Sequence, residues 1–200
     1  MFQYFHQRIM NNRNKLIDIF IKYNSQINLS AIRDPDWIYQ KHILDSIELN
    51  NFFNFKIWSS IADIGTWGGF PLLPLSITHP ECTFTGIDSI RKKVDTVNKM
   101  IQEIWIANAK AIWTRIEDYN GPQFDYVTAR AVGIIDKIID WSYELLKKSG
   151  FYILYKQYSI EEEKILHKIC KQKNLKLIKK HSYTLFAGDI QRMIYILQKN

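Results

Sequence analysis

Cysteine, glycine and proline are scarce in this 200-residue sequence, and each scarcity excludes a class of protein. The two cysteines, Cys82 and Cys170, lie far apart and form no Cys-x-x-Cys pair. This excludes a disulfide framework and a thiolate zinc site, and it favours a reducing compartment. Eight glycines and five prolines are too few for a collagen-like or low-complexity chain, and 46% hydrophobic residues exclude a disordered one. We therefore expect a chain that folds by itself around one core.

Long apolar runs are also missing. The sequence contains no run of about 18 apolar residues, the length that a membrane-spanning helix requires. Its first residues carry Arg8, Arg13 and Lys15 within a mixture of apolar and polar side chains, which does not match a secretory signal. These absences predict a cytoplasmic protein without a membrane partner.

Basic residues are in excess, with 27 Lys and Arg against 20 Asp and Glu and a formal net charge of +7. The excess leaves two interpretations open, a polyanionic partner such as nucleic acid or a solvated lysine-rich surface. The densest group follows residue 163 and comprises Lys164, Lys168, Lys171, Lys173, Lys176, Lys179 and Lys180.

The first quarter of the chain has the pattern of helices. Apolar residues recur at helical spacing over residues 1–23, and Asp34 followed by Pro35 is typical of the N-cap and first position of a second helix that ends near Asn50. We therefore expect residues 1–56 to form a helical N-terminal extension packed on the core, and residues 57–200 to form the main domain.

From Trp58 onward, short β-prone runs alternate with helical ones. The expected strands are residues 60–64, 83–87, 110–113, 124–128, 151–155, 175–178 and 193–197. The expected helices are residues 70–78, 90–104, 134–147 and 160–172. This alternation predicts an α/β fold with a mostly parallel, doubly wound sheet, closed by an antiparallel hairpin around a turn at residues 187–189.

Ligands of such sheets lie beyond the carboxyl ends of the strands, and the first two strand ends have the composition of a nucleoside site. The first runs into a glycine turn that starts at Gly65, where backbone can approach a ligand. The second ends at Asp88, an acid about 20 residues further on, which can accept both hydroxyls of an adenosine ribose. A dinucleotide fingerprint needs glycine at positions 67 and 70, where this chain has Trp67 and Phe70, so NAD is excluded.

Asp63, two residues before Gly65, suits a cofactor with a cationic amino-acid end, because its carboxylate can pair with an ammonium group directly or through water. S-adenosylmethionine combines adenosine, an amino acid and a sulfonium. The alternative interpretation is structural, with Asp63 capping the turn and Asp88 capping the next helix.

Later segments add three further candidates. Glu117 can accept from an adenine amino group while Ile116 covers the ring, or Glu117 can be a surface helix-cap carboxylate. Arg130, at the end of an apolar strand, is expected over the cleft, where a buried cation needs an anionic partner. His42 and Asp45 share a helix face and are catalytic candidates, although such pairs are more often surface or packing features. We find no metal-ligand pattern and expect no metal.

Several ordered segments together resemble the ribosomal RNA small subunit methyltransferase G family. In chain order these segments are Tyr23-Asn24-Ser25-Gln26-Ile27-Asn28-Leu29-Ser30-Ala31-Ile32 with Arg33-Asp34-Pro35, Lys41-His42-Ile43-Leu44-Asp45-Ser46, residues 63–75, Ile87-Asp88-Ser89 with Lys92-Lys93, Thr114-Arg115-Ile116-Glu117-Asp118, and residues 124–132. The resemblance covers residues 23–156. It implies a Rossmann-like, class I S-adenosylmethionine-dependent methyltransferase fold, with the main domain binding the cofactor.

Position by position, the resemblance implies cofactor contacts from Gly65, Phe70, Asp88, Ile116, Glu117 and Arg130. The sequence departs from the family pattern at two places. Trp67 stands where the family has its second glycine, and Gln157 follows Lys156 where the family has glycine. If position 67 requires a positive φ, a non-glycine residue there costs roughly 1 to 2 kcal/mol.

The activity that the resemblance implies is methylation of a guanine N7 in 16S rRNA. Guanine N7 has a lone pair and no proton, so this transfer needs alignment of donor and acceptor and no general base. We expect the protein to be a monomer whose partner is 16S rRNA or the small ribosomal subunit. The cleft-side basic residues are the candidates for RNA contact: Arg33, Lys41, Arg91, Lys92 and Lys93. Two alternatives remain, a methyltransferase with another substrate and a cofactor-free RNA-binding or ribosome-assembly protein.

Overall fold

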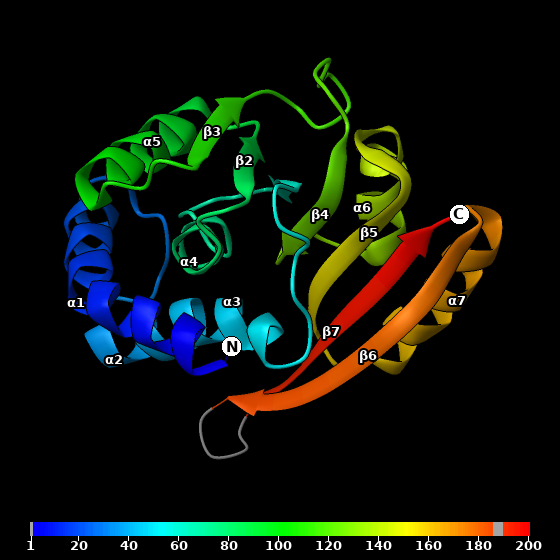
Figure 1. The fold of residues 1–200 in the computed structure, drawn as a ribbon, viewed down its shortest axis with the longest axis horizontal. Coiled ribbons are helices and arrows are strands. Elements are labelled where there is room, and N and C mark those ends of the chain that lie inside the picture. Colours follow the sequence, from blue (N-terminus) through cyan, green and yellow to red (C-terminus); the bar gives the residue numbers. More distant parts are fainter. Residues whose placement is uncertain (1, 186–189) are drawn as a thin grey trace.

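A computed structural model describes residues 2–185 and 190–200, with side chains from residue 7 onward; the expected turn at residues 187–189 lies outside the described residues. Its centre is a seven-stranded sheet with the order β3-β2-β1-β4-β5-β7-β6 (Figure 1). The strands are β1 (Ser60–Ile64), β2 (Thr83–Asp88), β3 (Ala109–Trp113), β4 (Phe124–Arg130), β5 (Leu146–Gln157), β6 (Leu175–Leu185) and β7 (Ile190–Lys199). Strands β1 to β5 pair in parallel, and β7 pairs antiparallel with both β5 and β6. The predicted fold class is confirmed.

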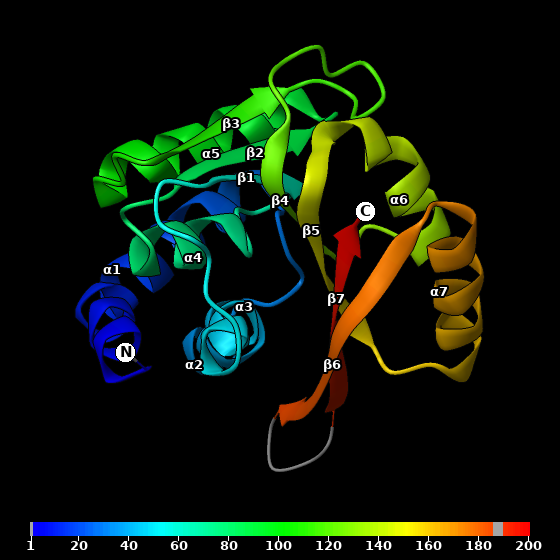
Figure 2. The ribbon, with the colours of Figure 1, turned by 45° about the vertical axis from the view of Figure 1, so that its right-hand side comes forward.

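Helices cover both faces of this sheet (Figures 1 and 2). The α-helices are α1 (Phe2–Ile27), α2 (Pro35–Ile38), α3 (Asp45–Ile47), α4 (Leu72–Thr78), α5 (Arg91–Ile104), α6 (Ile135–Ser142) and α7 (Ile160–Gln172). Helix α1 packs against α4 and α5 on one side, and α6 packs against α7 on the other. No described helix is both long enough and apolar enough to cross a membrane.

The central strands are buried on both faces, which explains their continuous apolar runs. In β5, Tyr152 and Leu154 belong to the core under α6 and α7, whereas Ile153 and Tyr155 belong to the core under α1, α4 and α5. All four side chains are at most 2% exposed. Alternate residues of one strand therefore hold the two helical layers together.

The segment after α1 begins as predicted. Asp34 is the N-cap of α2, and its Oδ1 accepts a hydrogen bond from the Trp37 N–H at 2.9 Å. The helix then passes through a π-helical stretch, Tyr39–Leu44, into α3 and ends in a 3₁₀ turn, Glu48–Asn51. This segment shares the α1-side core with the sheet, and the boundary after residue 56 stays a prediction.

The predicted element bounds differ from the structure at several places, most strongly at two. The helix expected over 134–147 ends at Ser142, and β5 already starts at Leu146, whose side chain is fully buried where it pairs with Phe124. Strand β6 extends to Leu185 instead of ending near residue 178. Its second half is polar on one face and hydrogen-bonded to β7, so hairpin pairing and not apolar content extends it.

Candidate active site

The loop after β1 is shaped for close approach to the backbone. Gly65 has φ +64, and a Cβ at this position would lie 2.8 Å from Cγ2 of Val132. Its N–H donates to the carbonyl of Ile87 at 2.8 Å, which fixes the loop against the end of β2. Any side chain at position 65 would therefore clash and be strained, so only glycine keeps this surface open.

Asp88, at the end of β2, holds the same loop from the other side. Its Oδ2 accepts from the N–H of Trp67 at 3.1 Å, and its Oδ1 accepts from the N–H of Ile90 at 2.9 Å. The side chain caps two backbone N–H groups of the flanking loops, but it does not cap the next helix as its structural interpretation predicts, because the N-cap of α5 is Ile90 and has no side-chain hydrogen bond. Each carboxylate oxygen has two lone pairs, so each can still accept a hydroxyl. The capping role and the ribose role are compatible.

These residues border a pocket of about 260 Å³, which we call the glycine-loop pocket. Its lining includes Gly65, Trp67, Asp88, Ile116, Glu117, Val132 and Trp141. Four of the six predicted cofactor residues are thus brought together: Gly65, Asp88, Ile116 and Glu117. The acceptor oxygens, an apolar side chain and an open glycine backbone fit the adenosine part of S-adenosylmethionine.

The other two predicted cofactor residues, Phe70 and Arg130, line a second pocket of about 310 Å³, the arginine pocket. Its lining includes Phe20, Leu29, Lys41, His42, Trp67, Phe70, Arg130, Gln157 and Arg192. Trp67 is the only described residue that lines both pockets. Sequence patterns did not single out Arg192, Phe20 or Leu29 as site residues, because they come from β7 and the N-terminal segment and only the tertiary fold joins them.

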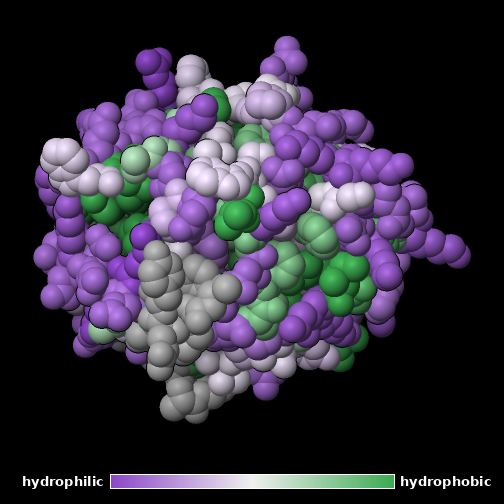
Figure 3. Space-filling view, in the orientation of Figure 1, coloured by the Kyte–Doolittle hydropathy of each residue, from purple (hydrophilic) through white to green (hydrophobic). Residues whose placement is uncertain are grey.

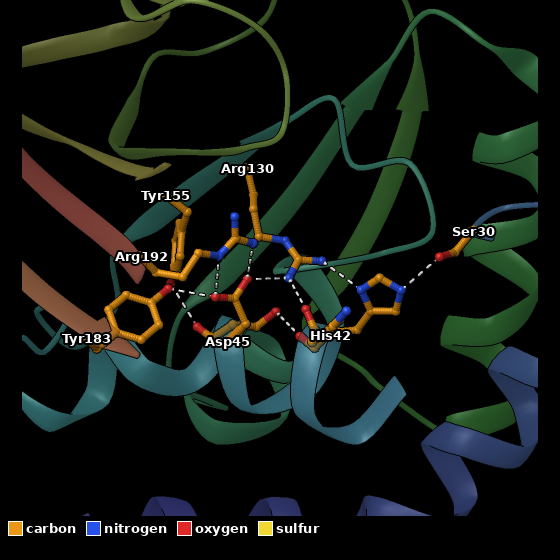
Figure 4. A network of polar contacts seen from close by, with 9 residues as sticks. Ser30, His42, Asp45, Arg130, Tyr155, Tyr183 and Arg192 are labelled. Carbon is orange, nitrogen blue, oxygen red and sulfur yellow. Dashed lines mark hydrogen bonds and ion pairs between the residues drawn. The ribbon is translucent and has the colours of Figure 1, made fainter. Parts of the chain in front are cut away.

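Arg130 is held by a buried carboxylate (Figure 4). Its Nη1 donates to Asp45 Oδ2 at 2.8 Å and to the carbonyl of Lys41 at 3.0 Å. The same carboxylate accepts from Arg192 Nη2 at 3.0 Å and from the Tyr183 hydroxyl at 2.6 Å. Asp45 is fully buried; burial alone would raise its pKa, but Arg130 and Arg192 hold the pKa below its ordinary value. Two guanidinium groups on one carboxylate leave a net positive charge beside the pocket.

His42 lies on the wall of the arginine pocket and orients Arg130. Its Nδ1 is 3.4 Å from Arg130 Nη2, and its Nε2 is 3.0 Å from the Ser30 hydroxyl (Figure 4). Because a guanidinium only donates, Nδ1 accepts and Nε2 carries the hydrogen. Burial and the charge of Arg130 lower the pKa of His42 to about 3, so the ring is neutral. Both ring nitrogens are thus engaged and the ring is stacked on Phe70, at 4.9 Å between centroids, so His42 has no nitrogen left to take a proton from a substrate.

Asp63 is predicted to pair with a cofactor directly or through water; its position does not favour the direct contact, and the contact through water stays a prediction. Asp63 is 1% exposed and is not among the described residues that line either pocket. Thr128 Oγ1 donates to its Oδ1 at 2.8 Å, whereas no described residue donates to its Oδ2. Burial raises the pKa of Asp63 to about 6. The unpaired Oδ2 behind the loop is an acceptor available to a water molecule or to a cationic group.

The predicted basic residues differ in their surroundings. Lys41 lines the arginine pocket, Lys93 Nζ lies 4.2 Å from the centre of the Trp67 ring, and the Arg91 guanidinium lies 5.2 Å from the centre of the Trp113 ring. In the C-terminal group, Lys173 pairs with Asp140 at 2.7 Å and Lys180 pairs with Glu163. Figure 3 shows hydrophilic side chains over much of one face, with apolar patches between them.

The second departure from the family pattern is structurally accommodated. Lys156 is mostly buried; its Nζ pairs with Glu162 at 2.7 Å and also donates to the carbonyl of Gly133. Gln157, at the end of β5, contributes to the lining of the arginine pocket and pairs with Arg192 in the β5–β7 register.

Solved structures with this fold include methyltransferases. An S-adenosylmethionine-dependent methyltransferase from Aquifex aeolicus superposes with a TM-score of 0.63 at 15% identity, covering 82% of this chain and 93% of that one. Pyrococcus horikoshii TYW2, solved in complex with MeSAdo, gives a TM-score of 0.61 at 11% identity, over 78% of this chain and 62% of that one. At these identities the likeness concerns the fold.

Sequence comparison reaches closer relatives. Ribosomal RNA small subunit methyltransferase G of Lysinibacillus sphaericus is 29% identical over 191 residues, covering 92% of this chain and 80% of the relative. The protein of the same name from Glaesserella parasuis is 36% identical over 149 residues, covering 74% of this chain and 70% of the relative. A family model described as rRNA small subunit methyltransferase G matches residues 9–193. The chain therefore belongs to the rRNA small subunit methyltransferase G family.

Proposed function

We propose that this protein transfers a methyl group from S-adenosylmethionine to N7 of a guanine in 16S rRNA. The observation that carries the proposal is the pairing of two pockets across Trp67. One is lined by acidic and apolar groups suited to adenosine, and the other is lined by arginines suited to an RNA base and its phosphates. Family membership supports the same substrate class.

In the glycine-loop pocket, Asp88 would accept the two ribose hydroxyls, Glu117 the adenine amino group, and Ile116 would cover the ring. Gly65 would leave the backbone open to the cofactor. When bound, S-adenosylmethionine supplies a methyl group on a positively charged sulfur. We assign Phe70 and Arg130 to the boundary between cofactor and acceptor, because they line the arginine pocket.

The acceptor requires orientation and no base. Guanine presents O6 and N7 as neighbouring acceptors, and N7 must stay free to attack the methyl group. Arg192 lines the pocket with a side chain that is 24% exposed, so it can donate to O6 while Asp45 holds it in place. His42 and Asp45 take no proton in this scheme. They fix the two guanidinium groups, and the lone pair of N7 becomes the new N–C bond as the C–S bond breaks.

The proposed setting is a monomer in the cytoplasm that acts on 16S rRNA or on an assembling small subunit. Trp67, which stands where the family has glycine, favours a second candidate, an RNA-binding or assembly protein that has lost its cofactor. A methyltransferase with a small-molecule or protein acceptor is the third.

Incubation of the purified full chain with methyl-labelled S-adenosylmethionine separates the three. We expect label in 16S rRNA from small subunits that lack the modification. Label in free metabolites or protein instead would favour the third candidate. Cofactor binding by calorimetry that is undetectable at millimolar ligand, together with RNA binding, would favour the second.

A further inference from the structure

Trp67 has a position that its neighbours in the glycine loop do not share. It is the only described residue that borders both the glycine-loop pocket and the arginine pocket. Its backbone N–H is fixed by Asp88 Oδ2 at 3.1 Å, while its side chain is 50% exposed. A large apolar side chain, on a loop anchored by this hydrogen bond, therefore lies partly exposed at the junction of the two pockets.

The backbone at this residue is strained. Trp67 has φ +48, a conformation that costs little only for glycine. Strained residues that persist at a pocket are reasonable starting points for a functional hypothesis. Trp105 also has a positive φ, of +68, but it follows helix α5 as its left-handed cap, is 86% exposed and is not among the described residues that line either pocket.

The charges around Trp67 identify the kind of ligand. Lys93 Nζ lies 4.2 Å from the ring centre, close enough for a cation–π contact. Lys41, Arg130 and Arg192 line the arginine pocket, and no described residue of that lining is acidic. An aromatic ring beside cations matches the pattern by which proteins stack single-stranded bases and pair with their phosphates. The cationic sulfonium end of the cofactor gains nothing from Lys93.

We propose that the indole of Trp67 is a stacking platform for an RNA base at the entrance of the arginine pocket, with Lys93 next to the phosphate of the same segment. This inference rests on the proposed function in one respect, that the anionic acceptor is RNA.

The test is RNA affinity, which does not depend on methyl transfer. A short, fluorescein-labelled single-stranded RNA containing guanine is titrated with wild type, Trp67→Gly, Trp67→Phe and Trp105→Gly by fluorescence anisotropy. Loss of one stacked base predicts an affinity for Trp67→Gly that is about five- to hundredfold lower than that of wild type. Trp67→Phe, which keeps a ring, should bind within about threefold of wild type, because any aromatic face can stack on a base.

Trp105→Gly is the matched control, since it makes the same substitution at a positive φ away from both pockets and should leave RNA affinity unchanged. Equal RNA affinity of Trp67→Gly and wild type would overturn the inference, as would an equal loss in Trp105→Gly. The proposed function is judged separately, by methyl transfer in wild type. If wild type methylates 16S rRNA and Trp67→Gly binds RNA as tightly as wild type, the proposed function stands and the stacking platform is refuted. If wild type fails to methylate 16S rRNA and Trp67→Gly loses RNA affinity, the stacking platform stands and the proposed function is refuted.

Discussion

At the scale of single residues, the carboxylates of the site have different tasks although all three are buried. Asp88 holds the glycine loop and faces a pocket, Asp45 neutralises arginines, and Asp63 lies behind the loop with one unpaired oxygen. The sequence placed Asp63 and Asp88 at strand ends, which the structure confirms. It could not distinguish their exposure, because that depends on how β4 and the loop pack against them.

Asp88→Ala tests the cofactor site. We expect the affinity for S-adenosylmethionine to fall at least tenfold, since two hydrogen bonds to a charged acceptor contribute about 1.5 to 3 kcal/mol each and the loop loses its anchor. Isothermal titration calorimetry measures this directly. Asp95→Ala, an exposed acid of α5 whose partner Arg91 lies 3.9 Å away, is the control and should bind normally. Unchanged affinity in Asp88→Ala would remove the ribose role.

Burial of Asp63 also has a signature in stability. Because its folded pKa is about 6 and its unfolded pKa 3.8, the folded state binds more protons between these values, and this group lowers stability as pH rises from 4 to 6. Above pH 6, Asp63→Asn should therefore be more stable than wild type, by up to about 3 kcal/mol. Urea unfolding at about pH 7.5 and about pH 4.5 compares the two. An advantage that is equal at both pH values would contradict the assigned shift.

His42 has the opposite dependence. Its folded pKa of about 3 lies below the unfolded value of 6.5, so the unfolded state gains the proton and stability falls as pH drops below 6.5. Between pH 6.5 and 5 the free energy of unfolding falls by about 2 kcal/mol through this group. His42→Gln should lose that part of the pH dependence. Both wild type and the variant keep the contribution of His79, whose burial lowers its pKa to about 4. The contribution of His42 is therefore the difference between the pH dependences of the two proteins.

At the scale of elements, Asp45 joins parts of the chain that are distant in sequence. It lies in α3, and its partners come from β4, β6 and β7 (Figure 4). Spacing along the helix suggested a relation between His42 and Asp45, and the structure gives both of them a common partner in Arg130. The sequence contained no local signal for Arg192 or Tyr183, because a contact across about 140 residues has no periodicity.

Asp45→Asn should be strongly destabilising, because it leaves two guanidinium groups without a buried counter-charge. A loss of about 3 to 5 kcal/mol is expected from breaking such a buried pair, measured as a lower urea midpoint. Asp36→Ala is the matched control: its carboxylate is 86% exposed and pairs with Arg13 at 3.3 Å, and its removal should cost at most about 1 kcal/mol. Equal effects of the two substitutions would mean that the network does not join these elements.

The strands were predicted best where burial is uniform. Ser60–Ile64 and the apolar part of β5 follow directly from their hydrophobic runs, whereas the polar second half of β6 depends on pairing with β7. The glycine loop was located from Gly65 and Asp88, but the division of the predicted site into two pockets was not. It arises because Phe70 and Arg130 face the N-terminal segment, an orientation that only tertiary packing fixes.

At the scale of the whole molecule, the net charge of +7 is distributed over two regions with different expected roles. Arg91, Lys92 and Lys93 belong to α5, and Lys93 lies against the Trp67 ring. The C-terminal lysines lie between residues 164 and 180, in and between α7 and β6, where Lys173 and Lys180 pair with acids. We expect RNA affinity to depend on Arg91, Lys92 and Lys93 more than on the C-terminal lysines.

Reversal of charge tests this. Arg91→Glu with Lys92→Glu should weaken RNA affinity and reduce its dependence on salt by about one counterion for each phosphate that the variant no longer neutralises. Lys168→Glu with Lys171→Glu changes the net charge by the same amount and should have a smaller effect on both quantities. If Lys168→Glu with Lys171→Glu weakens RNA affinity more than Arg91→Glu with Lys92→Glu does, the RNA surface lies on α7 instead.

The position of the transferred methyl group decides whether the proposed reaction is correct. Small subunits that lack the modification are incubated with the purified protein and methyl-labelled S-adenosylmethionine, and the labelled 16S rRNA is digested to nucleosides and analysed by mass spectrometry. The two-pocket site predicts that the label appears as N7-methylguanosine, and that Asp88→Ala lowers its yield when the cofactor concentration is limiting. Label on any other base atom or on ribose, or no label from a protein that binds the cofactor, would contradict the proposed reaction.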